Sequence, residues 1–444
     1  ALGLFEEPTV DVSGVAAVTR TSNQIAMADR VAADSLVLVK NDGVLPLAAP
    51  ASIALIGPNA DEVRNLFGDY SYPAHYESLK EVLRSGTDVL GDPVPASARI
   101  DETDSIGDVP TVLAEVVDRL PGSEVVHVRG CDVNSDERSG FDDAVAAAAN
   151  ADVAVMVMGE RSGLTDDCTT GESRDVSSLD LPGVQEELVR AVAATGTPLV
   201  IVLVSGRPVG SPAVHDAASA VLMAWLPGER GAPAIADALV GRHSPGGKLP
   251  VSFPRSSGQL PMFYAHKVSG GRSHWKGPYV DLSNEPLYPF GHGLSYSSFD
   301  LQPRAEDVVA GPGDVVDVRV AVTNTGTSRA DEVVQLYFRD PAASVTRPVR
   351  ELCGFRRVTL DAGETAEVVF ELAVNALGFA GRDHSYGVEA GVIELSAGSS
   401  SDDVAPAGTI VITGSDWAPV DRVFTTPTRL EPAGDTVRTD RPAG

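Results

Sequence analysis

Cysteine is scarce in this chain of 444 residues, which contains only Cys131, Cys168 and Cys353. Three cysteines are too few for the disulfide framework that stabilises a small secreted domain. One disulfide between Cys131 and Cys168 fits their positions, and three free thiols are the alternative. The sequence therefore predicts domains that are stabilised by hydrophobic cores rather than by cross-links.

Basic charge is also scarce. The 34 Lys and Arg face 62 Asp and Glu, so the formal net charge is −28. No basic stripe exists to neutralise phosphates, and we expect no nucleic-acid partner. No apolar run approaches the roughly 18 residues of a membrane-spanning helix, so we expect no membrane partner. The chain starts at Ala1 without a signal-peptide pattern, which leaves the compartment open between the cytoplasm and secretion.

Several motifs of cofactor and nucleophile chemistry are absent as well. There is no phosphate-binding loop, and no Gly-x-Gly-x-x-Gly follows an apolar strand. The eight His and three Cys show no metal-ligand spacing, and no Gly-x-Ser-x-Gly elbow occurs. We therefore expect neither a cofactor nor a metal.

Residues 21–262 alternate between unbroken apolar runs and helical segments of about 10–12 residues. Such runs are typical of strands buried on both faces of a parallel sheet, and such helices are typical crossovers. The pattern predicts an α/β sandwich, in which a mostly parallel open sheet is flanked by helices. The predicted strands are 35–39, 52–57, 124–128, 152–159, 198–204, 219–225 and 248–253.

The pattern changes after residue 300. Residues 300–414 contain short segments that alternate with period two and are separated by turns, which predicts an all-β sandwich. Residues 1–20 show no convincing period and are expected to be an extended lead-in. Residues 415–444 contain little apolar sequence and are expected to form a tail.

Residues 263–299 link the two predicted domains and are unusually rich in aromatic side chains. Such density favours a packed inter-domain strap. The alternative is that one or two of the rings line a ligand cleft. The aromatic residues are Phe263, Tyr264, Trp275, Tyr279, Tyr288, Phe290, Tyr296 and Phe299.

A polar segment follows the predicted strand 152–159. The carboxyl ends of parallel strands form the edge of an open α/β sheet at which ligands bind, and long loops in compact domains are usually functional or disordered. A carboxylate buried there could act as a general acid. The alternative is a solvated acidic loop. The acidic residues are Glu160, Asp166, Asp167, Glu172 and Asp175.

Many sequence blocks, in one order, resemble the C-terminal part of glycoside hydrolase family 3, of the β-glucosidase and β-xylosidase type. The most specific are 224–261 and LYPFGHGLSYSSF at 287–299. LGLFEEP at 2–8 resembles the segment that leaves the family's catalytic barrel. Further matches are DSLVLVKNDGVLPL (34–47), IALIGPNAD (53–61), TTGESRD to LDLPGVQEEL (169–188), and VTNTG (322–326), EVVQLY (332–337) and RPVRELCGF (347–355) of a fibronectin-III-like domain.

This resemblance implies a barrel, then the α/β sandwich, then a fibronectin-III or immunoglobulin-like sandwich. It implies a retaining, exo-acting β-glycosidase that hydrolyses terminal β-linked glucose or xylose from an oligosaccharide or aryl glycoside. Because the family's nucleophilic Asp belongs to the barrel, we expect residues 1–20 to lead in from a missing barrel domain, upstream or on a separate chain. We then expect no hydrolysis by this chain alone. A non-catalytic carbohydrate-binding or structural fragment is the alternative, and a homo-oligomer is left open.

The resemblance implies that Glu172 is the general acid/base, since it matches the Glu of the family's Gly-Glu-Gly-x-Asp-Arg-like motif. Ser173 replaces the second Gly of that motif, and Val176 stands where Arg is usual. Glu160 is the alternate candidate, because some members place the acid just after this strand. The spacing from Glu172 to the block 181–183 favours Glu172.

Further candidates lie outside the loop. Asp69 and Tyr70 follow an early strand and could border the sugar cleft, and Trp275 could stack on a sugar face or pack between domains. Ser415-Asp416-Trp417 resembles the family's nucleophile motif. It follows the last predicted strand of the β-sandwich, with only the tail behind it, so we expect this match to be a coincidence.

Overall fold

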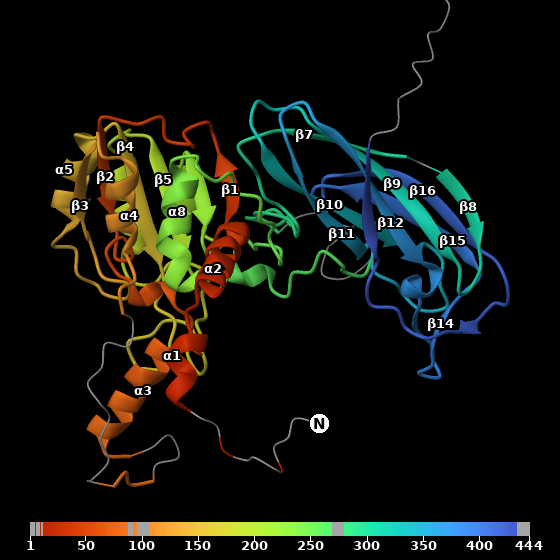
Figure 1. Ribbon diagram of the computed structural model, residues 1–444, viewed down its shortest axis with the longest axis horizontal. Coiled ribbons are helices and arrows are strands. Elements are labelled where there is room, and N and C mark those ends of the chain that lie inside the picture. The colour runs from red at the N-terminus through yellow and green to blue at the C-terminus, as the bar shows by residue number, and fades with distance from the viewer. Residues whose placement is uncertain are drawn as a thin grey trace, which may run out of the picture.

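The computed structural model has an α/β domain and an all-β domain that lie side by side (Figure 1). The structure describes Phe5, Thr9 and residues 12–87, 92–95, 107–268, 279–304 and 306–432. Within these residues, no helix has both the length and the apolar character that crossing a lipid bilayer requires. Cys131, Cys168 and Cys353 are free thiols, as the second of the two alternatives proposed.

The first domain is built on a six-stranded sheet in the order β1-β6-β5-β4-β2-β3. Five strands are parallel, and the edge strand β1 pairs antiparallel with β6. The prediction of a mostly parallel open sheet is confirmed. The strands are β1 (Val37–Asn41), β2 (Ser52–Ile56), β3 (Glu124–Val128), β4 (Val153–Gly159), β5 (Leu199–Val204) and β6 (Ala220–Met223).

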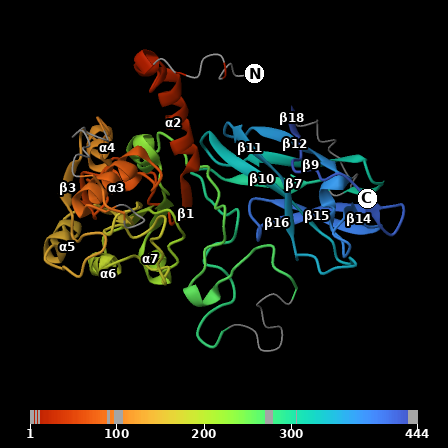
Figure 2. The same ribbon diagram turned by 90° about the horizontal axis from the view of Figure 1, so that it is seen from below.

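Helices cover both faces of this sheet, which explains its unbroken apolar strands. In β2, Ile53 and Leu55 pack towards α2, α4 and α8, whereas Ala54 and Ile56 pack towards α5, α6 and α7. Figure 2 shows α2 and α4 on one side of the domain and α5, α6 and α7 on the other. The helices are α2 (Ser22–Ser35), α4 (Val112–Arg119), α5 (Phe141–Ala149), α6 (Gln185–Ala193), α7 (Pro212–Ala217) and α8 (Gly231–Leu239).

A further helix, α3 (Tyr72–Ser85), projects from this domain (Figure 1). It follows the end of β2 through the short helix η2 (Arg64–Leu66). It ends at Gly86, whose φ of 75° is the left-handed conformation typical of a helix C-terminus. The segment between η2 and α3 contains Asp69 and Tyr70.

Two predictions for this half of the chain are wrong. Residues 248–253 do not form a strand: Pro250 cannot donate a ladder hydrogen bond, and Phe253 makes only an isolated bridge with Tyr288. The free edge of β1 instead meets Leu294, through a bridge with Leu38. The lead-in is not wholly extended, because the short helices η1 (Val12–Gly14) and α1 (Val15–Val18) lie within it.

The second domain is a β-sandwich, as predicted. Its two sheets run in the orders β11-β10-β15-β16-β8 and β18-β12-β9-β7, with a small sheet β13-β14-β17 beside them. The strands are β7 (Phe299–Pro303), β8 (Glu306–Ala310), β9 (Val315–Asn324), β10 (Ala330–Arg339), β11 (Glu351–Leu360), β12 (Thr365–Ala373), β13 (Phe379–Ala380), β14 (Tyr386–Val388), β15 (Gly391–Gly398), β16 (Val404–Ile412), β17 (Ala418–Pro419) and β18 (Thr428–Pro432).

The sandwich extends beyond residue 414, where the sequence predicted a tail. Strand β18 pairs antiparallel with β12 over five residues, and β17 pairs with β14. The sequence of β18, TRLEP, carries one apolar side chain of any size, so its period-two signal is too weak to detect. Its ladder is instead completed by backbone hydrogen bonds and by charged side chains, such as Arg429 with Glu371 at 2.7 Å.

Polar contacts join the two domains. Lys248 and Glu332 form an ion pair of 2.7 Å whose side chains are about nine-tenths buried, and Lys248 also donates to the Gly293 carbonyl. Arg357 on β11 pairs with Asp34 of α2 at 2.7 Å. Separating the domains would break the buried Lys248–Glu332 pair and leave uncompensated charges, so this contact resists their separation.

The aromatic segment 263–299 packs extensively between the domains. Tyr264 stacks on Phe290 with ring centroids 4.2 Å apart, and the Tyr296 hydroxyl donates to the Ala238 carbonyl at 2.7 Å. Phe263 stays exposed. Trp275 lies outside the described residues. Most of the described rings of this segment therefore pack, as expected for an inter-domain strap. At least one ring remains at the surface, as the ligand-cleft alternative requires.

His215 is buried where α7 meets this segment. Its Nε2 lies 2.9 Å from the Val209 carbonyl, and its Nδ1 lies 3.2 Å from the Tyr288 hydroxyl. These partners suit a neutral ring that donates from Nε2 and accepts at Nδ1. Burial lowers the pKa of His215, and it lowers the pKa of His292, which stacks on Tyr288.

We predict that these histidines make stability depend on pH. Their folded pKa values lie below the unfolded value of about 6.5, so the unfolded chain binds more protons as the pH falls. The free energy of unfolding should therefore decrease below pH of about 6.5. Urea unfolding between pH 8 and pH 5 measures this slope. His215→Gln should reduce the slope, whereas His384→Gln, at an exposed histidine, should not. Equal slopes in the unsubstituted protein and both variants would contradict the prediction.

Candidate functional site

The polar loop predicted after residues 152–159 joins β4 to α6, and both of its ends are fixed to the sheet. Gly159 has a φ of 137°, and a Cβ there would lie 1.9 Å from the Val204 carbonyl oxygen, so only glycine fits. The buried Gln185 side chain accepts from the Gly159 N–H at 2.9 Å and donates to the Gly159 carbonyl at 2.7 Å. The loop therefore starts from a rigid position.

Glu160 is fully buried and all of its carboxylate is engaged. Its Oε1 lies 2.7 Å from Nη2 of Arg207 and accepts from Nε at 2.8 Å. Its Oε2 accepts from the Ser205 hydroxyl at 2.6 Å. Arg207 also donates to the Asp180 carbonyl at 3.0 Å, so the same ion pair fixes the return of the loop. Glu160 has the geometry of an anchor, with no oxygen exposed to a substrate.

The start of the loop is also held by Glu77 of α3. Its two carboxylate oxygens accept from Nε of Arg64 at 2.8 Å and from Nη2 of Arg161 at 2.9 Å. Arg64 is buried, and Arg161 is four-fifths buried. Glu77 therefore joins the segment after β2 to the loop after β4.

Two of the predicted acidic loop residues are paired rather than simply solvated. Asp167 lies 3.0 Å from Arg161 and accepts from the Thr165 hydroxyl at 2.5 Å, and Asp166 lies 2.5 Å from Arg174. Partial burial opposes ionisation of Asp167, but the Thr165 hydrogen bond and the Arg161 charge outweigh it and lower its pKa. The lowered pKa of Asp167 does not suit a proton donor, and Asp166 is engaged by Arg174.

Glu172 is presented differently, at the surface and on a sharp turn. Gly171 has a φ of 129°, and a Cβ there would lie 2.4 Å from the Gly163 carbonyl oxygen. Ser173, at the second-glycine position of the family motif, has a φ of 61°, a left-handed conformation that costs a non-glycine residue about 1–2 kcal/mol. On this turn Glu172 is exposed, and its carboxylate reaches Tyr70 in the segment after β2.

Asp69 and Tyr70 hold Glu172 in place. Asp69 Oδ2 accepts from the Glu172 backbone N–H at 3.0 Å, and the Tyr70 hydroxyl donates to Glu172 Oε2 at 2.9 Å. The hydrogen bond to Glu172 and its negative charge raise the pKa of Tyr70, which keeps that hydroxyl a proton donor. Oε1 of Glu172 has no described partner, so it is available to a ligand. The structure thus brings together three of the predicted site residues.

Other predicted features lie elsewhere or outside the described residues. Trp275 is not described. Asp416 lies between β16 and β17 of the second domain, and its neighbour Trp417 packs edge-to-face on Phe379 and donates to the Ser385 hydroxyl. Helix α3 starts next to Tyr70, and β14 pairs with β17. In both views α3 and β14 lie at opposite ends of the molecule (Figures 1 and 2).

Glu77, Arg64 and Arg161 are site residues that were not predicted from the sequence. Arg161 follows Glu160 directly, which was a local signal, but Glu77 lies 84 residues earlier and carries no motif. Among the described residues, no group of three or more His, Cys, Asp and Glu side chains could hold a metal ion.

Comparison with known proteins identifies both domains. Residues 36–296 match the family model of the glycosyl hydrolase family 3 C-terminal domain, and residues 332–401 match that of the fibronectin type III-like domain. A β-xylosidase of Formosa agariphila is 35% identical over 407 residues, which cover 90% of this chain and 52% of that protein. A periplasmic β-glucosidase of Salmonella typhimurium is 35% identical, covering 90% and 51%.

Solved structures agree with these relatives. A mutant form of the β-glucosidase of Listeria innocua, in complex with laminaribiose, superposes with a TM-score of 0.79 at 30% identity, and the match covers 93% of this chain and 53% of that chain. Its complex with glucose has a TM-score of 0.77. This chain therefore spans about half the length of the relatives that it matches.

We predict that Glu77 is required to hold the loop. Glu77→Ala leaves the buried Arg64 without its carboxylate partner. This change should lower the free energy of local opening of the loop by about 3 kcal/mol. Amide hydrogen exchange across residues 161–172 should then rise roughly 100-fold. Glu81→Ala, on the same helix, is the matched control, because Glu81 forms no ion pair with another described residue. Unchanged exchange in Glu77→Ala would show that the loop is held by other contacts.

Proposed function

This chain belongs to glycosyl hydrolase family 3, and we propose that it is the C-terminal part of a retaining, exo-acting β-glycosidase. The proposed substrates are β-linked oligosaccharides or aryl glycosides with terminal glucose or xylose. The relatives named β-xylosidase and β-glucosidase support this substrate class, as do the laminaribiose and glucose complexes of the Listeria innocua enzyme.

We propose Glu172 as the general acid/base of the reaction. The observation that carries this assignment is the contrast between two glutamates on one loop. Glu160 is buried with both carboxylate oxygens bound, whereas Glu172 is exposed, turned outwards and oriented by Asp69 and Tyr70. A general acid must reach the proton acceptor within hydrogen-bond distance, which only the second arrangement permits.

In the proposed first step, protonated Glu172 donates its proton to the glycosidic oxygen as the bond to the anomeric carbon breaks. Tyr70 donates to Oε2, which leaves Oε1 to carry the proton. In the second step, the Glu172 carboxylate removes a proton from the water that attacks the glycosyl–enzyme intermediate. Asp69 holds the Glu172 backbone, so the carboxyl group keeps one position in both steps.

The nucleophile is proposed to come from outside this chain. Retaining hydrolysis needs a second carboxyl group about 5–5.5 Å from the acid/base. We propose that a barrel domain, upstream or on a separate chain, supplies it. We therefore expect the 444-residue chain alone not to hydrolyse aryl β-glycosides.

We predict that Glu172→Ala, in a protein that combines this chain with its barrel, lowers turnover of poor leaving groups by about 10²–10⁴-fold. An activated aryl glycoside needs little protonation, so its bond cleavage should be affected much less. Azide should partly restore its turnover, because a small anion can replace the general base in the second step. Steady-state kinetics with and without azide measure both effects.

Glu160→Ala serves as the comparison variant. It should lower stability, because it leaves Arg207 without its buried partner, and azide should not restore its activity. The assignment would be overturned if Glu160→Ala were the variant that azide rescues while Glu172→Ala kept normal turnover.

A further inference from the structure

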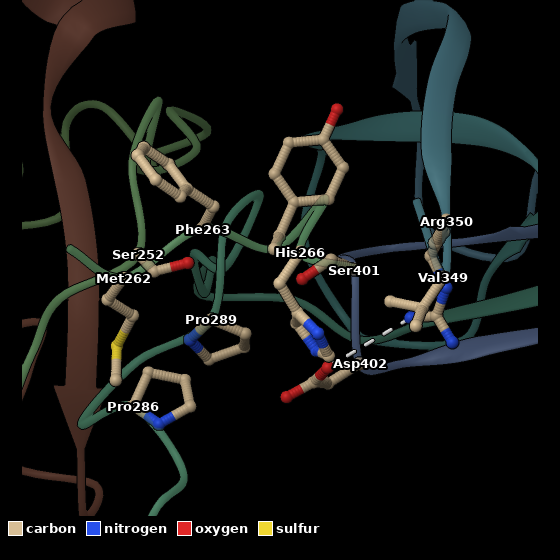
Figure 3. A pocket seen from close by; sticks show the side chains of 11 residues that line it. Ser252, Met262, Phe263, His266, Pro286, Pro289, Val349, Arg350, Ser401 and Asp402 are labelled. Atoms are coloured by element: carbon tan, nitrogen blue, oxygen red, sulfur yellow. Dashed lines mark ion pairs between the residues drawn. The ribbon is translucent and has the colours of Figure 1, made fainter. Parts of the chain in front are cut away.

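A separate cavity lies where both domains meet the aromatic segment, and none of its lining residues belongs to the loop that carries Glu172. Its volume is about 270 Å³. Figure 3 shows Met262 and Phe263 on one side of the cavity and Arg350 on the opposite side, with His266 and Asp402 between them. The cavity thus has an apolar wall facing a charged one.

The backbone around this cavity is held in a fixed arrangement. The Val349 N–H donates to the His266 carbonyl at 2.9 Å, and the Ser401 N–H donates to the Phe290 carbonyl at 2.9 Å. Tyr264 stacks on Phe290. These contacts join the aromatic segment to two loops of the β-sandwich, so the two walls keep their separation without a ligand. Preformed sites of this kind lose little entropy on binding.

Arg350 and Asp402 of the charged wall do not hydrogen-bond to each other. Arg350 and Asp402 approach to 3.9 Å, which is beyond hydrogen-bond distance, and their side chains are 31% and 59% exposed. Arg350 forms no closer ion pair with another described residue. Guanidinium donors and carboxylate acceptors therefore lie side by side at the wall, able to bind a group that both donates and accepts.

We infer that this cavity binds one ring of a neutral saccharide. Adjacent sugar hydroxyls each donate and accept, which matches the neighbouring Arg350 donors and Asp402 acceptors. The C–H face of the ring can lie against Phe263, a residue that is 64% exposed. The charges of Arg350 and Asp402 cancel, and the formal net charge of the chain is −28. An anionic ligand therefore gains little electrostatic attraction in this cavity.

The identity of the saccharide as a fragment of a β-glucan or xylan rests on the proposed function. A sugar bound at this cavity would keep a polysaccharide attached to the enzyme while its end is processed elsewhere. Such a second contact raises the effective concentration of chain ends without changing the chemistry.

The test uses the 444-residue chain and three probes: cellohexaose, laminarihexaose and xylohexaose. Binding is measured by isothermal titration calorimetry and by saturation-transfer NMR. We expect at least one probe to bind, Phe263→Ala and Asp402→Asn each to weaken that binding at least tenfold, and Phe263→Tyr to retain it. Phe424→Ala is the matched control, because Phe424 is also exposed, at 79%, but lies outside the cavity.

Glu172→Gln separates this inference from the proposed function. The inference predicts that the binding which Phe263→Ala weakens is retained in Glu172→Gln. Binding that is lost in Glu172→Gln but retained in Phe263→Ala would place the saccharide at the candidate catalytic loop and overturn the inference. Absence of binding for all three probes would also overturn it, while leaving the kinetic test of Glu172 unaffected.

Discussion

The buried ion pair between Glu160 and Arg207 is the interaction on which the candidate site depends. A carboxylate with no exposed surface is tolerated only when charged and polar partners surround it, and Arg207 and Ser205 supply them. Arg207 also holds the Asp180 carbonyl, so one guanidinium ties the outgoing and returning ends of the loop. With its ends fixed, the loop can carry Glu172 outwards on a turn whose backbone is unfavourable for most residues.

Sheet topology explains why residues from distant parts of the sequence meet here. Strands β2 and β4 are parallel neighbours, so the segments that follow them leave the same edge of the sheet. The first segment carries Asp69, Tyr70 and then Glu77, and the second carries Arg161 and Glu172. Tyr70 and Glu172 are 102 residues apart in sequence, yet they share a hydrogen bond. Glu77 then joins the two segments through Arg64 and Arg161.

The sequence predicted features that local patterns encode and missed those that depend on distant partners. The parallel strands were visible because residues such as Ile53 and Ala54 pack on opposite faces of the sheet and are both apolar. The segment 248–253 had the same apolar character but failed as a strand, since Pro250 lacks a donor. Strand β18 is stabilised by its ladder with β12 rather than by an apolar face, so it could not be detected. Glu172 could be chosen from its motif, but the role of Glu77 could not, because its arginine partners are fixed only by the fold.

We propose that the loop after β4 uses Glu160 as its anchor and presents Glu172 to the reaction. A crystal structure of this chain joined to the proposed barrel domain, with an unhydrolysed substrate analogue bound, is the decisive test. We expect the Glu172 carboxyl group to lie within hydrogen-bond distance of the glycosidic oxygen and about 5–5.5 Å from the proposed barrel nucleophile. A Glu172 carboxyl group more than about 9 Å from that nucleophile, or Glu160 released from Arg207 and placed on the glycosidic oxygen, would overturn the proposal.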